Sequence, residues 1–232
     1  MQSIQVLFED NHFIAINKNV SDIVQSDKSG DKSLEEIVKK YIKEKYQKTG
    51  DIFLGVAHRL DRPVSGVLLF ARTGKALQRI NKMFQERRIQ KIYWTIVKNK
   101  PPKNSDYLLH YLVRNSDKNV NKAFTKEVAQ SQKAELNYKL IGSSNNYFFL
   151  EIKPLTGRHH QIRAQLQAIG CPIKGDLKYG FVQTNYNGGI HLHARKMEFI
   201  HPVKNQSIQI IANPPKDILW DEYVKIAEEK FK

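Results

Sequence analysis

Residues 58–72 read HRLDRPVSGVLLFAR, and they join a charged loop to an apolar strand. The run Val67–Arg72 has the composition of a strand that is buried in a sheet. Pro63 and Gly66 restrict the loop before it to an unusual backbone shape, because proline fixes φ and glycine tolerates positive φ. The stretch therefore predicts a rigid loop that leads into a central strand.

Asp61 is the residue of this loop that can carry chemistry. It lies between Arg59 and Arg62, and the nearby positive charge favours the ionised form of its carboxyl group. The plain interpretation is a surface turn with a salt bridge. A functional interpretation requires partners from elsewhere in the chain.

Short strands and a few helices are expected on both sides of this stretch. Ser33 and Glu36 have the spacing of a capping box, and Thr73 is the expected N-cap of a second helix. The remaining predicted elements are the strands Ile4–Phe8, Phe13–Asn17, Ile92–Lys98, Ala134–Ile141, Tyr147–Lys153, Ile190–Phe199 and Ser207–Ala212, a helix over His160–Ile169, and a last helix that starts at Asn213-Pro214-Pro215, with Ile218, Leu219, Tyr223 and Ile226 inward.

Strands outnumber helices in this prediction, and short turns join most successive strands. We expect a large, mostly antiparallel sheet with helices against it, which is an α+β fold. Between Pro101 and Lys133 the sequence is polar and rich in Asn, Ser and Lys, so we expect an irregular stretch there that is partly loop and includes one broken hairpin.

The composition indicates a basic protein. The 232 residues include 38 Lys and Arg against 23 Asp and Glu, a formal net charge of +15. Such an excess occurs in any lysine-rich proteome, but it also fits a polyanionic partner, either nucleic acid or an acidic membrane surface. No apolar run is long enough to span a membrane, and the N-terminus lacks a signal layout. One cysteine excludes a disulfide framework, and we expect a cytoplasmic protein.

Two further segments combine polar and aromatic groups. Tyr93, on the predicted strand Ile92–Lys98, belongs to the sheet surface or core, or else it stacks on a base or transfers a proton. Residues 155–163 read LTGRHHQIR, and the Thr-Gly pair before a helix is a potential phosphate site. Arg163 is expected at the edge of the buried helix face, where its charge needs a partner, and a carboxylate such as Asp61 would supply one.

The histidines allow two other hypotheses. His191 and His193, together with His159 and His160, suggest a zinc site, but neither an HExxH spacing nor a cysteine pair is present. A histidine pair for ribonuclease-type acid–base chemistry is the second alternative. We expect no metal site.

Taken together, these segments resemble the RluA-like family of pseudouridine synthases. The matching pieces are HRLDRPVSGVLLFAR (58–72), KIYWTIV (91–97), LTGRHHQIR (155–163), GCPIKGDLKYG (170–180) and LHARKMEFIHP (192–202), with VLFEDNHFIAINK (6–18) similar to the family's opening. Three departures are Val64 in place of the usual Thr, His159 in place of Thr or Ser, and Asn19 in place of the proline of a Lys-Pro-Ala-Gly stretch.

The resemblance implies roles for individual residues. Asp61 is the expected nucleophile, Tyr93 is expected against the target base, and Arg163 is expected to pair with Asp61. Arg59 is expected to help displace the uridine from its stack, and Leu192 or Ile162 to pack near the base. The substrate- or RNA-binding residues implied in this way are His58, Arg59, Arg62, Arg158, His160, Gln161, Ile162 and Leu192.

The resemblance also implies the overall biochemistry. We expect an enzyme that isomerises uridines of rRNA or tRNA by base flipping, without a cofactor. We expect one catalytic domain over residues 1–232 without an N-terminal S4 domain, RNA as the partner, no membrane, no obligate protein partner, and a monomer. The main alternative is a non-catalytic RNA-binding module that has kept the fold.

Overall fold

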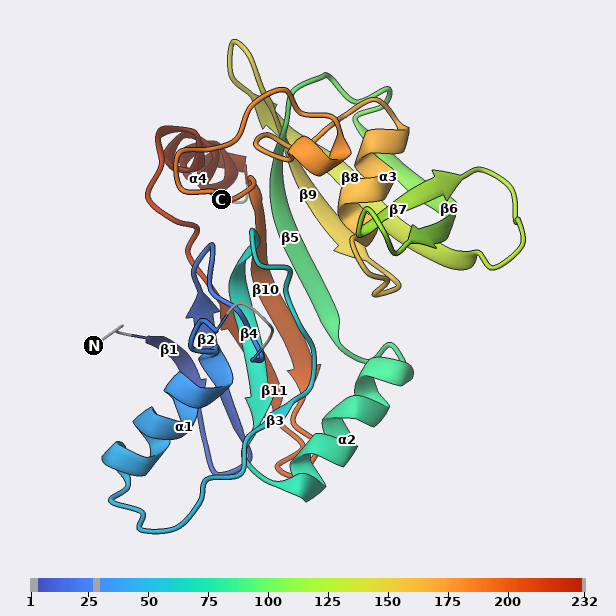
Figure 1. Cartoon of the computed structure of the whole chain (residues 1–232). Helices are drawn as coiled ribbons and strands as arrows, with labels where there is room; N and C mark the ends of the chain where they lie inside the picture. Colours follow the sequence, from blue (N-terminus) through green and yellow to red (C-terminus); the bar gives the residue numbers. More distant parts are fainter. Residues whose placement is uncertain (1–3, 27–29, 231–232) are drawn as a thin grey trace. The chain divides into compact units, whose positions relative to one another are not determined.

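The computed structural model describes residues 4–26 and 30–230, and the chain forms two compact units (Figure 1). Unit 1 comprises the chain as far as Gln90 together with Ala194–Asn213, and unit 2 comprises Lys91–His193 and the segment from Pro214 onward. Each unit is described by itself. The expectation of a single domain over residues 1–232 therefore stays a prediction.

Unit 1 is built on antiparallel strands around the predicted central strand. β2 pairs with β1 on one side and with β4 on the other, β3 pairs with the end of β4, and β10 lies next to β4 and pairs with β11. The strands are β1 (Gln5–Glu9), β2 (Phe13–Lys18), β3 (Gly55–Val56), β4 (Ser65–Ala71), β10 (Leu192–Ile200, in this unit from Ala194) and β11 (Ser207–Ile211).

Two helices cover opposite faces of this sheet. Because side chains alternate along a strand, the odd positions of β2 and β4 face α2 (Gly74–Gln85) and the even positions face α1 (Leu34–Lys45). Leu69 thus packs with Ile80 of α2, whereas Leu68 packs with Val38 of α1. This explains why β4 is buried along its whole length, as the sequence predicts.

Both helices of unit 1 begin at the residues that the sequence indicates. The hydroxyl of Ser33 accepts the backbone N–H of Glu36 at 3.3 Å, and the hydroxyl of Thr73 accepts that of Ala76 at 3.1 Å. These bonds satisfy amide groups of the first helical turn that have no partner within the helix. Both cap predictions are confirmed.

Unit 2 contains five strands in the order β5-β9-β8-β6-β7, and all four printed neighbours are antiparallel. The helix α4 packs its buried residues against one face, with Trp94, Phe149 and Tyr223 in the same cluster. The helix α3 packs Ala164 with Leu112 and Ala134. The elements are β5 (Gln90–Val97), β6 (Ser105–Asn115), β7 (Val120–Phe124), β8 (Gln132–Ser143), β9 (Phe148–Pro154), α3 (Gln161–Ala168), the 3-10 turn η1 (Leu177–Tyr179) and α4 (Ile218–Lys230).

Two sequence-based predictions need correction in this unit. Between Pro101 and Lys133 the chain forms more sheet than expected, because Ser105–Asn115 is the long strand β6 and pairs with β7 as a hairpin. Leu108, His110 and Leu112 are buried, and Tyr107 and Leu109 on the other face of β6 are exposed. The last helix begins at Ile218 rather than at the prolines, and Ile218 is 87% exposed instead of facing inward. Among the described residues, no helix is long and apolar enough to cross a membrane.

Candidate functional site

The loop between β3 and β4, which carries Asp61, is held by its own backbone. The N–H of Val64 donates to the carbonyl of Asp61 at 3.0 Å and closes a turn. The carbonyl of Arg62 accepts the N–H of Ser21 at 3.0 Å. The replacement of the usual Thr by Val64 does not affect these backbone bonds, because they involve no side chain of that residue.

Lys18, the last residue of β2, stabilises the same loop through hydrogen bonds. Its ammonium group donates to the carbonyls of Asn19, Arg62 and Val64 at 2.9, 3.0 and 2.8 Å. The side chain is fully buried. The ammonium of Lys18 thus fixes the backbone on both sides of Pro63.

The charge of Lys18 is electrostatically coupled to the loop. Burial lowers the pKa of Lys18 to about 8, while the negative charges of Asp22 and Asp61 act in the opposite direction. Sequence reasoning missed this residue. The available signal was its position, since Lys18 shares the α1 face of β2 with Ile14 and Ile16, where a charge is expensive to bury.

Gly66 allows β4 to approach β10 closely. Its φ is +116°, and an added Cβ would lie 2.3 Å from the carbonyl oxygen of Ala194. Only glycine fits this backbone position. The prediction that Gly66 gives the loop an unusual shape is confirmed.

The other predicted residues of this loop differ in their surroundings. His58 accepts the N–H of Leu69 through Nε2 at 3.0 Å, and its ring lies 5.3 Å from that of Phe84, so it anchors the loop to β4 and α2. Arg59 is exposed, and Arg62 is also exposed and pairs with Asp31 at 2.7 Å. Their contribution to RNA binding stays a prediction.

Tyr93 belongs to unit 2, on β5 opposite Ile152 of β9. The alternation along β5 is as predicted, because Trp94 and Ile96 pack in the core against α4. On the side of Tyr93, the hydroxyl of Thr95 donates to the carbonyl of His191 at 2.8 Å. Tyr93 is therefore on the face of β5 that α4 does not cover.

The segment before α3 is ordered by Gln161. The side-chain oxygen of Gln161 accepts from the hydroxyl of Thr156 at 2.7 Å and from the N–H of Arg158 at 3.0 Å, and its amide donates to the carbonyl of Glu135. The Thr156 hydroxyl and the Arg158 N–H, which a bound phosphate would use, thus already donate to Gln161. This arrangement does not favour the hypothesis of a phosphate site at the Thr-Gly pair.

Arg163, on α3, has a carboxylate partner within unit 2. Its Nε donates to Oδ2 of Asp176 at 2.7 Å and its Nη2 to Oδ1 at 2.8 Å. The expectation that this buried charge needs a carboxylate is confirmed, and sequence reasoning missed Asp176 as one supplier. Asp61 belongs to unit 1, whereas Arg163 and Tyr93 belong to unit 2. The pairing of Arg163 with Asp61 and a contact of Tyr93 with Asp61 therefore stay predictions.

The remaining predicted residues lie around α3 and at the start of β10. Ile162 and Leu192 are 7% and 3% exposed, and Arg158 donates through Nε to the carbonyl of Lys133 at 3.1 Å. His160 is buried and bonds through Nδ1 to the hydroxyl of Tyr179 at 3.0 Å. None of these contacts tests the expected binding roles.

The histidine pair of the nuclease hypothesis is part of a structural network. Nε2 of His191 lies 3.1 Å from Asp217, and its Nδ1 lies 3.0 Å from the amide of Asn185. The ring stacks on Trp220 at 5.3 Å, and His193 meets the same ring edge-on. Because both ring nitrogens of His191 are engaged, this arrangement does not favour acid–base chemistry.

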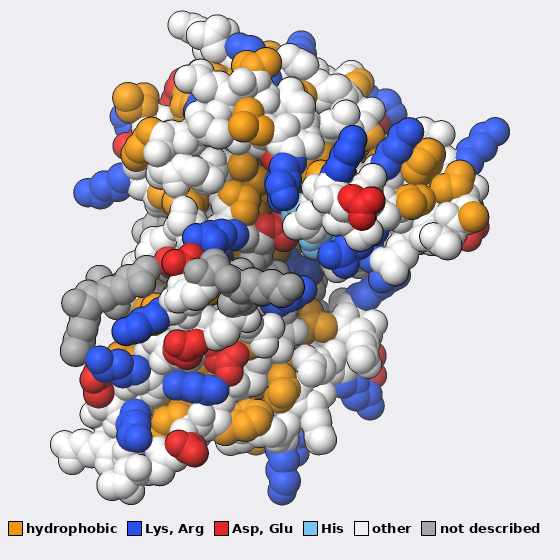
Figure 2. All heavy atoms as spheres, in the orientation of Figure 1, with side chains coloured by type: hydrophobic (Ala, Val, Ile, Leu, Met, Phe, Trp, Pro, Cys, Tyr) orange, Lys and Arg blue, Asp and Glu red, His pale blue; other side chains and the backbone are white. Residues whose placement is uncertain are grey.

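The basic character of the chain is visible on its surface. Lysine and arginine side chains are spread over the visible face of both units (Figure 2). The outer face of α2 presents Lys75, Arg79 and Lys82, all exposed. Exposed cations of this kind are the groups that contact phosphates, although Lys82 also pairs with Glu86 at 3.7 Å.

Comparison with known sequences gives a consistent result. A family model described as RNA pseudouridylate synthase matches residues 12–168, more than half of the chain. Ribosomal large subunit pseudouridine synthase C of Rickettsia prowazekii is 32% identical over 212 residues, which are 90% of this chain and 68% of that protein. tRNA pseudouridine synthase C of Salmonella typhimurium is 30% identical over 228 residues, 90% of this chain and 85% of that protein.

Solved structures show the same fold. Human RNA Pseudouridylate Synthase Domain Containing 4 superposes with a TM-score of 0.77 at 21% identity, covering 97% of this chain and 93% of that one. Human RNA Pseudouridylate Synthase Domain Containing 1 gives a TM-score of 0.72 at 21% identity, with coverage of 96% and 88%. The predicted α+β class is confirmed.

Proposed function

The chain belongs to the RNA pseudouridylate synthase family and is an RNA pseudouridine synthase, and on this basis we propose that it isomerises specific uridines of ribosomal or transfer RNA with Asp61 as nucleophile. The observation that carries the assignment of Asp61 is its loop. Backbone bonds and the buried ammonium of Lys18 hold that loop in one shape, which is what a reacting carboxylate requires.

The reaction needs a nucleophile but no net oxidant. The N1–C1′ bond breaks, the detached uracil turns, and C5 bonds to C1′. The C5 proton is lost while N1 gains one, so the composition is unchanged. A carboxylate can assist either by attacking the sugar or by removing a sugar proton to give a glycal. We expect no cofactor in either route.

Arg163 and Tyr93 complete the proposed site. Arg163 orients the Asp61 carboxylate, because a guanidinium is a strong hydrogen-bond partner of a carboxylate. Tyr93 packs against the freed uracil while it turns. Arg59 fills the space that the flipped nucleotide leaves, and this flip costs a few kcal/mol in a structured RNA.

Relatives name two classes of substrate. The Rickettsia relative is named for the ribosomal large subunit and the Salmonella relative for tRNA. The formal net charge of +15 supports contact with the phosphates of either RNA. Both RNAs are therefore substrates to be offered in the assay.

The test compares the wild type with Asp61→Asn on unmodified large-subunit rRNA and tRNA transcripts. We expect the wild type to form pseudouridine and Asp61→Asn to lose turnover at least about 10³-fold, with RNA affinity preserved. Asp51→Asn, which removes the same charge from an exposed position of unit 1, is the matched control. Turnover by Asp61→Asn at the rate of this control would refute the assignment.

A further inference from the structure

The guanidinium of Arg163 is held from one edge by Asp176. Nε and Nη2 donate to the two oxygens of the same carboxylate, at 2.7 and 2.8 Å, and the Asp176 side chain is 1% exposed. Such a two-point bond fixes the plane of the guanidinium as well as its position. A single-point contact would leave rotation about the bond.

Tyr179 supports the guanidinium from its flat side. The centre of the ring lies 5.0 Å from Cζ of Arg163. The Tyr179 hydroxyl accepts the N–H of Asn121 at 2.8 Å and bonds to Nδ1 of His160 at 3.0 Å, so the ring is held at its far end as well. Burial, aided by the charge of Arg163, lowers the pKa of His160 to about 2, so His160 is neutral.

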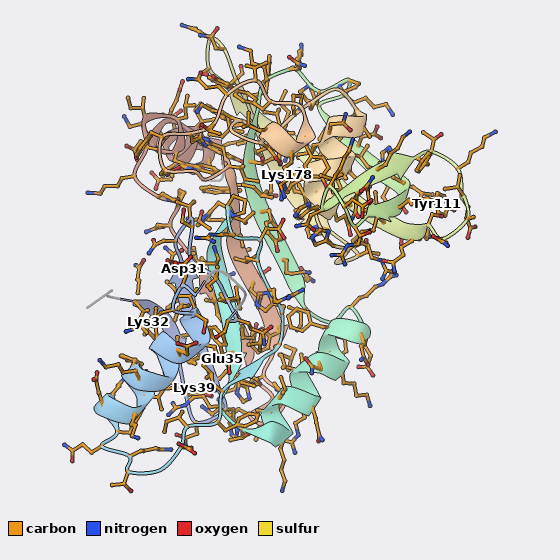
Figure 3. The ribbon with its side chains drawn as sticks, viewed as in Figure 1. Asp31, Lys32, Glu35, Lys39, Tyr111 and Lys178 are labelled. Carbon is orange, nitrogen blue, oxygen red and sulfur yellow. The ribbon has the colours of Figure 1, made fainter. Side chains whose placement is uncertain are left out.

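The segment that carries Asp176 and Tyr179 has its own backbone order. The carbonyl of Asp176 accepts from the N–H groups of Tyr179 and Phe181, each at 3.1 Å, which closes η1 (Figure 3, where Lys178 is labelled). Gly175 has a φ of +87°, and a Cβ there would lie 2.9 Å from the carbonyl of Gly189. Asp176 therefore presents its carboxylate from a rigid turn.

We propose that Asp176 is a positioning residue of the synthase, which holds the guanidinium of Arg163 in the orientation that its role in the reaction requires. This inference rests on the proposed function of Asp61 and Arg163. The Nε–Nη2 edge is bound to Asp176, and the ring of Tyr179 restricts the plane. Asp176 touches neither substrate nor Asp61 in this role, and it acts only through Arg163.

The test is Asp176→Asn, with kcat, KM and thermal unfolding measured together. The amide retains one acceptor oxygen, so Arg163 loses one of its two bonds. We expect kcat to fall on the order of 10- to 100-fold with KM for RNA unchanged, because a small displacement of a catalytic group slows the chemical step.

Asp217→Asn is the matched control in the same unit. Asp217 is also an aspartate that is bonded to a basic side chain, that of His191, but it does not contact Arg163. We expect this variant to lose stability while its kcat per folded molecule stays that of the wild type. If Asp176→Asn does not fold, Asp176→Glu replaces it, because it keeps the buried charge and shifts the guanidinium by about one methylene. The expected result is again a lower kcat with unchanged KM.

The outcomes are distinguishable. If the wild type forms no pseudouridine on either RNA, the proposed function fails. If the wild type is active and a folded Asp176 variant keeps the wild-type kcat, the inference is overturned and the proposed function stands. If kcat falls only in proportion to the folded fraction, Asp176 has a purely structural role and the inference is again overturned.

Discussion

Lys18 is a lysine in a fully buried environment. Its ammonium is buried beneath the Asp61 loop and donates to three carbonyl groups. The pKa of Lys18 is about 8 in the folded chain, against the ordinary 10.5. As the pH rises, the folded chain therefore releases this proton at a lower pH than the unfolded chain does. The protonation of Lys18 therefore affects both the free energy of unfolding and the geometry of the Asp61 loop.

The first prediction concerns Lys18→Met. Between pH 8 and 10.5 the unfolded wild type binds more protons at this position than the folded form, so the free energy of unfolding rises with pH, by up to about 3 kcal/mol. We expect this rise in the wild type and not in Lys18→Met. We also expect kcat to fall by about 10- to 100-fold in the variant, because the Asp61 loop loses its anchor.

Urea unfolding at a series of pH values measures the rise. Lys48→Met, which removes an exposed lysine of the same unit, is the control and should keep the wild-type slope. Equal slopes in Lys18→Met and the control would show that Lys18 is not the group that titrates.

The candidate site was predictable to different extents residue by residue. Asp61, Tyr93 and Arg163 were singled out because motifs several residues long surround them. Lys18 and Asp176 were not, because their importance lies in which carbonyl or guanidinium they reach, at separations of 46 and 13 residues. Spacing along the chain does not encode such contacts.

At the scale of elements, local signals predicted the helix starts well. The capping bonds of Ser33 and Thr73 form within three residues, so the sequence contains all the information. The length of β6 was missed because apolar side chains such as Leu109 lie on its outward face and the polar His110 lies on its inward face, so no clean alternation is visible in the sequence. The start of α4 was misplaced because Asp217, which accepts the N–H of Leu219 at 3.0 Å, begins the helix after the prolines.

A second prediction belongs to this scale. Ser33→Ala removes the cap of α1 and should lower the free energy of unfolding by about 1 kcal/mol, because the N–H of Glu36 loses its acceptor. Activity at a temperature where both proteins are folded should not change. Chemical denaturation of Ser33→Ala beside Ser116→Ala, an exposed loop serine, measures the difference, and equal stabilities would contradict the capping role.

At the scale of the whole molecule, ionisable groups predict sensitivity to acid. Burial lowers the pKa of His110, His160, His191 and His201 below the ordinary 6.5. Below pH 6.5 the unfolded chain therefore binds more protons than the folded chain, and stability falls as the pH falls. Asp10 and Asp217, with pKa values of about 2, add a second loss below about pH 4.

The expected result is a urea midpoint that declines steadily from pH 7 to pH 4. The histidines account for the upper part of the decline and the aspartates for the lower part. A midpoint that is constant or that rises between pH 7 and pH 5 would contradict the burial of these imidazoles as neutral groups.

The central claim is that this chain makes pseudouridine in RNA through Asp61. The most direct measurement maps pseudouridines in the rRNA and tRNA of the source organism after deletion of the gene, and after complementation with the wild type or with Asp61→Asn. We predict that at least one pseudouridine disappears on deletion, returns with the wild type and stays absent with Asp61→Asn. Persistence of every pseudouridine after deletion, or restoration by Asp61→Asn, would contradict the account.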